Sequence, residues 1–180
     1  MVEGVGAFIA WIGASLIVLA DGRRGLALGT AIAAAGLGVV VWQAAGPLAA
    51  LLIGAGGVVA AARRFTSGAA GWGVMPPGST PRIILSVACA LIALWVALGI
   101  TTGHSAALRF SVLTLLGLAG ARVLASEGVE VQLTAVALLA IAVAAATGLD
   151  AGEPAVWPYL AAAFIAAGVG WLRLSTPSAA

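Results

Sequence analysis

Few residues in this chain could do chemistry, and four of them stand out by type and position. His104 changes its charge near neutral pH, and Arg109, five residues later, could bind an anion. Trp11 and Trp95 lie inside apolar segments, and we expect both on the same side of a membrane as His104. These four residues are our candidates for a site that binds a ligand, either an amphipathic or aromatic molecule or an anion.

Each candidate also has a plain structural explanation. A lone histidine in a loop is usually solvated. Arg109 could extend its guanidinium to the headgroups, or it could pair with Asp150 or Glu153. Tryptophans often form an aromatic belt at the membrane surface or pack between helices. Three further aromatic residues should share that half of the membrane: Trp42, Trp157 and Tyr159.

The residue types that are missing exclude several classes of membrane protein. The chain has no lysine, so a retinal Schiff base is impossible. One histidine and one cysteine cannot form a His/Cys zinc site or a bis-histidine haem site within the chain. Proton pumps typically carry a carboxylate near the midplane, but every acidic residue here lies at the end of an apolar segment or in a loop. We expect no catalytic residue, no metal and no cofactor.

The composition indicates one membrane-embedded domain over residues 1–180. The chain is 63 % hydrophobic and 8 % charged, whereas soluble domains carry about 25 % charged residues. Its net charge of +2 gives no indication of nucleic-acid binding. Apolar segments long enough to cross a bilayer need roughly 17–25 residues. Seven segments come near that length: 4–20, 25–42, 47–62, 83–100, 106–125, 131–147 and 155–172.

The positions of the arginines orient these segments. Short loops rich in arginine stay on the cytoplasmic side, and with seven spans only Arg109 of the eight arginines lies on the other side. Without the doubtful third span, this asymmetry would collapse. The sequence therefore predicts an all-α, polytopic transmembrane helix bundle of about seven spans, with the N-terminus outside and the C-terminus in the cytoplasm. The cytoplasmic arginines would be Arg23, Arg24, Arg63, Arg64, Arg82, Arg122 and Arg173.

Small residues should hold the helices together, because they let backbones approach closely in lipid. We expect such seams along residues 25, 29 and 33 and along residues 117, 121 and 125, and a packing site at the glycines of 54–57. A faint similarity also predicts a parallel three-helix repeat, 1–70 and 106–180, joined by the span at 83–100.

The proline-rich stretch 73–81 should not be helical. We expect it to form a cytoplasmic loop with Arg63, Arg64 and Arg82 at its ends, which are our candidates for contact with a partner or with anionic lipid. Arg122 should simply extend to the headgroups.

These features favour a non-catalytic multi-pass membrane protein that serves as a subunit or scaffold of a larger membrane complex. It would contact the lipid bilayer and either other membrane subunits or copies of itself. The absence of lysine and asparagine indicates a GC-rich genome and so favours the plasma (inner) membrane of a bacterium. The alternative is a small transporter or channel for a neutral or weakly anionic solute, which the possible repeat and the aromatic residues would support.

Overall fold

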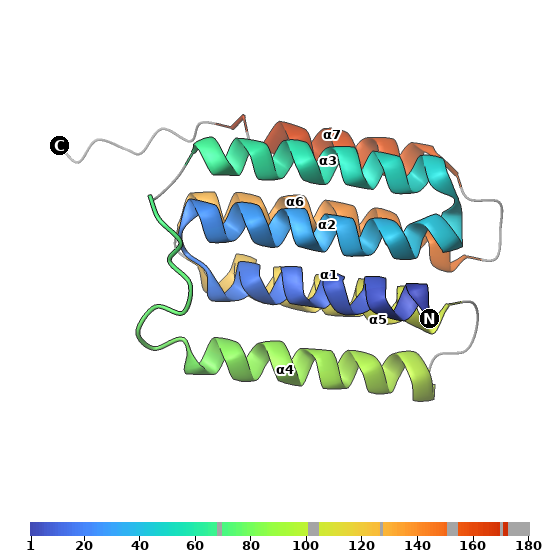
Figure 1. Ribbon diagram of the computed structural model, residues 1–180, viewed down its shortest axis with the longest axis horizontal. Helices are drawn as coiled ribbons and strands as arrows, with labels where there is room; N and C mark the ends of the chain where they lie inside the picture. Colours follow the sequence, from blue (N-terminus) through green and yellow to red (C-terminus); the bar gives the residue numbers. More distant parts are fainter. Residues whose placement is uncertain (68–69, 101–104, 127, 151–154, 170, 173–180) are drawn as a thin grey trace.

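A computed structural model describes residues 1–67, 70–100, 105–126, 128–150, 155–169 and 171–172. These residues are mainly helical (Figure 1). The helices are α1 (Val2–Leu19), α2 (Arg23–Ala45), α3 (Pro47–Thr66), α4 (Thr80–Trp95), α5 (Ala106–Ala125), α6 (Val129–Ala146) and α7 (Trp157–Val169). A π-helical turn, η1 (Val96–Ile100), continues α4, and a 3₁₀ turn, η2 (Thr147–Leu149), continues α6.

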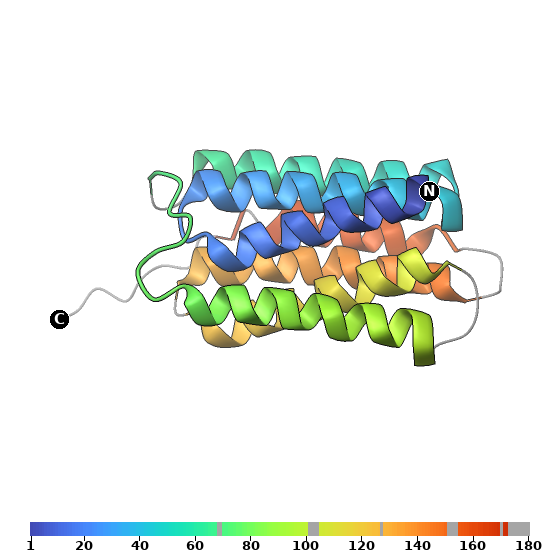
Figure 2. The ribbon, with the colours of Figure 1, turned by 60° about the horizontal axis from the view of Figure 1, so that its bottom comes forward.

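The helices lie side by side in two layers (Figures 1 and 2). One layer holds α1, α2 and α3, and the other holds α5, α6 and α7; α1 contacts α5, and α3 contacts α7. The corresponding helices of the two predicted repeat halves thus face each other, while the repeat itself stays a prediction. α4 lies at the edge formed by α1 and α5 and is the least buried of the long helices.

Six described helical segments are long and apolar enough to cross a membrane, as judged by length and composition. This property indicates a membrane protein. The doubtful third segment is one of the six, because α3 runs for 20 residues through its glycines. The seventh, α7, has only 13 helical residues, which span roughly 20 Å. A bilayer core is about 30 Å thick, so the count of seven spans stays a prediction.

One local expectation was wrong. Thr80 and Pro81 are helical and open α4, with the proline in the first turn. Proline is tolerated there because the first backbone N–H groups of a helix have no intrahelical acceptor. The non-helical stretch therefore ends at Ser79.

Glycines let α1 and α2 pack with their backbones in contact. A Cβ added at Gly13 would lie 2.7 Å from the carbonyl oxygen of Gly29 and closer still to the backbone of Ala33. A Cβ added at Gly36 would collide with the backbone of Ala10. The predicted seam along 25, 29 and 33 is therefore confirmed at 29 and 33, where α1 forms its other side, whereas a Cβ added at Gly25 would meet Ala20 and the backbone of Trp72.

The other predicted seams are used unequally. Gly56 lies against Ala163 of α7, and Gly57 lies against Ala34 of α2, so the packing site at 54–57 is confirmed for two of its glycines. Along the second seam a Cβ added at Gly117 would meet the sulfur of Cys89 on α4, but Ala125 is exposed.

We predict that Gly13→Ala and Gly36→Ala each destabilise the fold by roughly 1–3 kcal/mol, because overpacking forces the helices apart. The matched control is Gly120→Ala in α5, where an added Cβ meets nothing within 4 Å. It should be neutral or stabilise by up to about 1 kcal/mol through helix propensity. The measurement is the midpoint of thermal unfolding in mild detergent, read from the fraction of each variant that stays monodisperse on gel filtration after heating. Equal midpoints for all three variants would contradict the packing assignment.

Candidate functional site

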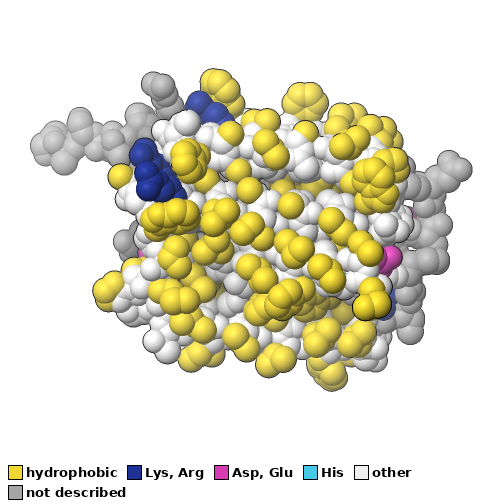
Figure 3. Space-filling model, viewed as in Figure 1, with side chains coloured by type: hydrophobic (Ala, Val, Ile, Leu, Met, Phe, Trp, Pro, Cys, Tyr) yellow, Lys and Arg dark blue, Asp and Glu magenta, His cyan; other side chains and the backbone are white. Residues whose placement is uncertain are grey.

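Basic residues gather at one end of the bundle. We call this the basic end, and it holds the α1–α2 turn, residues 70–79, the end of α5 and the start of α6. Figure 3 shows dark blue side chains at this end of a face that is otherwise mostly hydrophobic. Because the chain has no lysine, these side chains are arginines. Among the described residues, the arginines of this end are Arg23, Arg24, Arg63, Arg64, Arg82 and Arg122, whereas Arg173 lies outside the described residues.

Asp21 is the centre of the basic end. It lies in the turn between α1 and α2, and its two carboxylate oxygens accept hydrogen bonds from Arg82 Nη1 at 3.1 and 3.0 Å. Arg122 Nη2 donates to the same carboxylate and, at 2.9 Å, to the carbonyl oxygen of Ala20. One carboxylate thus joins the α1–α2 turn to the start of α4 and the end of α5.

Arg122 does not extend to the headgroups, and that expectation was wrong. Its side chain is 3 % exposed. A buried guanidinium needs a charged partner and hydrogen-bond acceptors, and Asp21 with Ala20 supplies both. The sequence signal was present, because Asp21 is the one acidic residue in a short turn beside two arginines, but spacing alone could not identify Arg122 as its partner.

The segment 71–75 docks on the same turn through its backbone. Asp21 N donates to the carbonyl oxygen of Gly73 at 3.0 Å, and Met75 N donates to that of Leu19 at 3.0 Å. Gly73 has a φ of +51°, and a Cβ there would collide with the backbone of Gly22. Only glycine fits both this conformation and this close approach. Residues 71–75, in the connection between α3 and α4, are therefore fixed against the turn between α1 and α2.

The three arginines predicted to contact a partner or anionic lipid differ in their surroundings. Arg64 is 6 % exposed and lies 3.9 Å from the carboxylate of Glu130. The Arg63 guanidinium lies 3.9 Å above the ring of Trp171, a cation–π geometry. Arg82 is half-buried and paired with Asp21. The burial of Arg64 does not favour a contact role, whereas Arg24, which the sequence predicts only as a cytoplasmic arginine, is exposed.

Electrostatics keeps the Asp21 carboxyl ionised. Burial would by itself raise its pKa, but hydrogen bonds and positive charge from Arg122 and Arg82 outweigh burial and lower the pKa below its ordinary value. A carboxyl group with a depressed folded-state pKa stabilises the fold above its unfolded-state pKa. That stabilisation is lost as the pH falls through the folded-state pKa.

At the opposite end, the predicted ligand residues are only partly brought together. Trp11 lines an apolar cavity between α1, α4 and α5, and its Nε1 donates to the carbonyl oxygen of Ser86 at 3.4 Å. Trp95 is 66 % exposed and does not line that cavity. Arg109 donates to the carbonyl oxygen of Ala97 from Nε at 3.2 Å and from Nη2 at 2.9 Å. His104 lies outside the described residues.

Sequence reasoning missed one polar pair at this end. Ser105 Oγ donates to Glu3 Oε2 at 2.8 Å, and the same oxygen accepts from Leu108 N at 3.1 Å and so caps α5. Serine before an apolar helix is a recognisable cap signal, but its pairing with a residue 102 positions away is not.

The hydroxyl groups buried between the helices are mostly bonded within their own helix. Each of four donates to the carbonyl oxygen four residues earlier, which satisfies it without a partner helix: Thr30, Ser111, Thr114 and Thr134. Ser15 and Ser86 form an interhelical bond of 2.6 Å between α1 and α4. In the described part of the chain, no three His, Cys, Asp or Glu residues could hold a metal ion together.

We predict that Asp21→Asn lowers the stability of the fold by roughly 1–2 kcal/mol, a value reduced by solvent because Asp21 is 41 % exposed. The wild type should lose this stability as the pH falls below about 4, and Asp21→Asn should not. Thermal unfolding in detergent between pH 3 and pH 7 is the measurement, with Asp150→Asn at the opposite end as control. The same acid dependence in both variants would contradict the role of Asp21.

Comparison with protein-family models, with curated proteins and with solved structures found no match to this chain. Its function must therefore be argued from its own charges, cavities and helix packing.

Proposed function

We propose that the chain is a non-catalytic subunit or scaffold of a larger membrane complex in the plasma membrane of a bacterium. Its basic end would face the cytoplasm, and other membrane subunits or further copies of the chain would pack against its helices. The observation that supports this proposal is a groove in the outward surface of α2 and α3.

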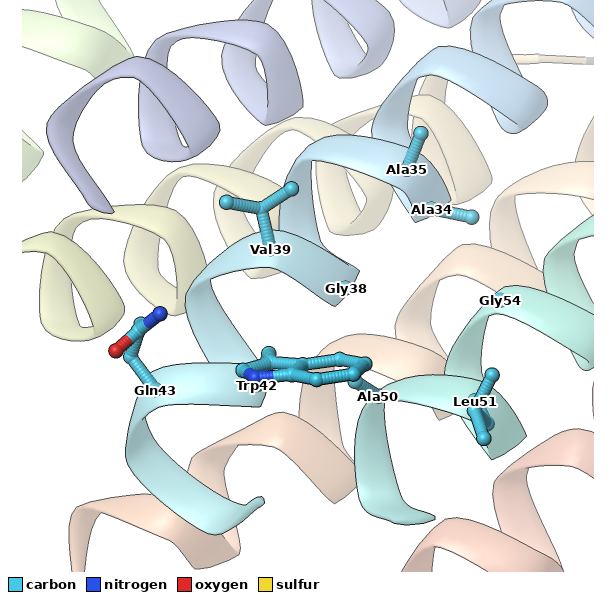
Figure 4. A pocket seen from close by; sticks show the side chains of 9 residues that line it. All are labelled: Ala34, Ala35, Gly38, Val39, Trp42, Gln43, Ala50, Leu51 and Gly54. Carbon is cyan, nitrogen blue, oxygen red and sulfur yellow. The ribbon is translucent and has the colours of Figure 1, made fainter. Parts of the chain in front are cut away.

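This groove has a volume of about 430 Å³ and small residues along both walls (Figure 4). Ala34 and Gly38 stand four residues apart on α2, and Ala50 and Gly54 stand four residues apart on α3. Figure 4 shows the Trp42 ring extending from α2 toward α3 at one end of the groove. Small residues at this spacing are typical of helix–helix contacts in membranes, so the groove fits the ridge of a further transmembrane helix.

The glycines of the groove have no evident role within the chain. A Cβ at Gly54 would meet nothing within 4 Å, and one at Gly38 would make only an ordinary contact, 3.7 Å from the carbonyl oxygen of Ala50. Glycine costs a helix about 1 kcal/mol relative to alanine. Close approach of an external backbone would explain both positions, in contrast to Gly56 and Gly57, which serve internal packing.

Transport of a polar solute finds less support. A solute path needs polar groups that face a common space, but Thr30, Ser111, Thr114 and Thr134 are each bonded to their own helix. The groove on α2 and α3 and the cavity beside Trp11 are open at the surface of the bundle and are lined almost entirely by apolar residues.

We predict that Gly54→Leu weakens assembly, because the leucine side chain would occupy the groove, where an added Cβ meets nothing within 4 Å. Gentle detergent purification followed by native mass analysis should show at least about tenfold less co-purifying partner or oligomer, equivalent to about 1.4 kcal/mol. Gly120→Leu, at another glycine with open space around its Cβ that lines neither cavity, is the matched control. A wild-type protein that purifies only as a lone monomer would contradict the subunit hypothesis.

Orientation can be tested separately in a Cys89→Ala background, which removes the single cysteine. In intact cells, Asp150→Cys should react with a membrane-impermeant thiol reagent and Pro77→Cys should not. Both positions are exposed in the structure, so both should react once the cells are permeabilised. The reverse labelling pattern would place the basic end outside.

A further inference from the structure

A second cavity, of about 510 Å³, opens between α1, α4 and α5 at the end opposite the basic end. Its larger lining residues are Phe8, Trp11, Leu91, Leu94, Leu98 and Phe110. The rings of Phe8 and Trp11 lie 5.3 Å apart and form one wall. A cavity of this size is comparable to small-molecule sites, and its walls offer almost nothing but apolar contact.

The cavity arises because α4 is attached unevenly along its length. Near the middle of the helix, the Ser15–Ser86 bond and the Trp11–Ser86 bond hold α4 against α1. Beyond this point the helix widens into the π-helical turn, whose Leu98 lines the cavity. α4 contacts α1 and α5 but neither α2 nor α3 to a comparable extent, so the cavity lies at the edge of the bundle, within reach of lipid.

An empty cavity would leave its lining atoms without contacts on one side. In a bilayer, the apolar molecule always present at this edge is a lipid acyl chain. Whether one lipid is preferred depends on polar groups near the cavity mouth, and these are present.

Two opposite charges lie next to lining residues in the sequence, and we call them, with Ser105, the rim. Glu3 precedes the lining residue Gly4 on α1 and accepts the hydrogen bond from Ser105. Arg109 precedes the lining residue Phe110 on α5 and is held toward η1 by its bonds to Ala97. A guanidinium favours a phosphate, and a carboxylate favours an ammonium group that can donate hydrogen bonds. A headgroup with both groups complements this rim, whereas a purely anionic headgroup would face Glu3.

We propose that this cavity holds an acyl chain of one bound phospholipid, whose zwitterionic headgroup lies over Glu3, Ser105 and Arg109. The chemistry fits a phosphoethanolamine headgroup, which carries a phosphate and a primary ammonium. This inference does not rest on the proposed function, because the assembly groove lies on other helices, α2 and α3.

The first test compares lipids on the intact protein. Detergent-purified chain is incubated with phosphatidylethanolamine, phosphatidylcholine or phosphatidylglycerol of identical acyl chains, and bound lipid is counted by native mass spectrometry. We expect one tightly held phosphatidylethanolamine per chain, retained at least about fivefold better than either other lipid. Equal retention of the three lipids would overturn the proposal.

Two variants test the cavity and its rim. Gly4→Leu should fill the cavity and reduce retention of phosphatidylethanolamine about tenfold, while Gly120→Leu, at a glycine that lines neither cavity, should leave it unchanged. A Cβ at either glycine meets nothing within 4 Å, so both variants should keep the wild-type elution profile. Glu3→Gln should remove the preference for phosphatidylethanolamine over phosphatidylcholine. Unchanged retention in Gly4→Leu would overturn the cavity assignment, and an unchanged preference in Glu3→Gln would overturn the headgroup assignment.

A spectroscopic measurement covers the case in which Gly4→Leu fails to fold. Phosphatidylethanolamine with brominated acyl chains should quench the fluorescence of Trp11, isolated as the difference between wild type and Trp11→Phe. We expect quenching that saturates near one lipid per chain. Quenching that only rises in proportion to lipid would show ordinary bilayer contact and overturn the proposal.

Discussion

The carboxylate of Asp21 is the interaction on which the arrangement of α1, α4 and α5 depends. These three helices are far apart in sequence, and lipid offers little hydrophobic driving force for their association. The charge of Asp21 attracts Arg82 at the start of α4 and Arg122 near the end of α5, while the backbone of its turn binds the 71–75 segment. These contacts fix the start of α4 against α1 and α5, whereas at the other end η1 is bonded to α5, through Arg109 and Ala97.

The kind of contact between neighbouring helices explains where the cavities lie. Between α1 and α2, glycines such as Gly13 and Gly36 bring the backbones into contact and leave no space. Between α1 and α4, the contacts are single side-chain bonds at Ser15 and Ser86, and large residues fill the remainder incompletely. The glycines of this chain thus fall into two groups. Those between α1 and α2 are required by internal packing, whereas Gly4 and Gly54 border space that the chain itself does not fill.

The helices could largely be predicted from the sequence, because apolar length and arginine-bearing turns are local signals. The third segment shows this: its glycines made it doubtful, yet α3 is continuous. The start of α4 was missed by two residues because proline was treated only as a helix breaker. The surroundings of individual side chains could not be predicted, because they depend on which helices become neighbours. Arg122 becomes buried only because the α1–α2 turn lies beside α5, and Trp11 lines a cavity only because α4 packs beside α1 and α5.

Arg109 shows how local geometry modifies a rule based on charge counting. It was the single arginine that the predicted topology left on the outer side. In the structure its guanidinium binds the carbonyl oxygen of Ala97, in the last turn of η1. The final carbonyl groups of a helix lack intrahelical donors, and a positive charge near them is favourable. Arg109 therefore has a structural reason to lie where it does, so its position is no argument against an orientation with the basic end in the cytoplasm.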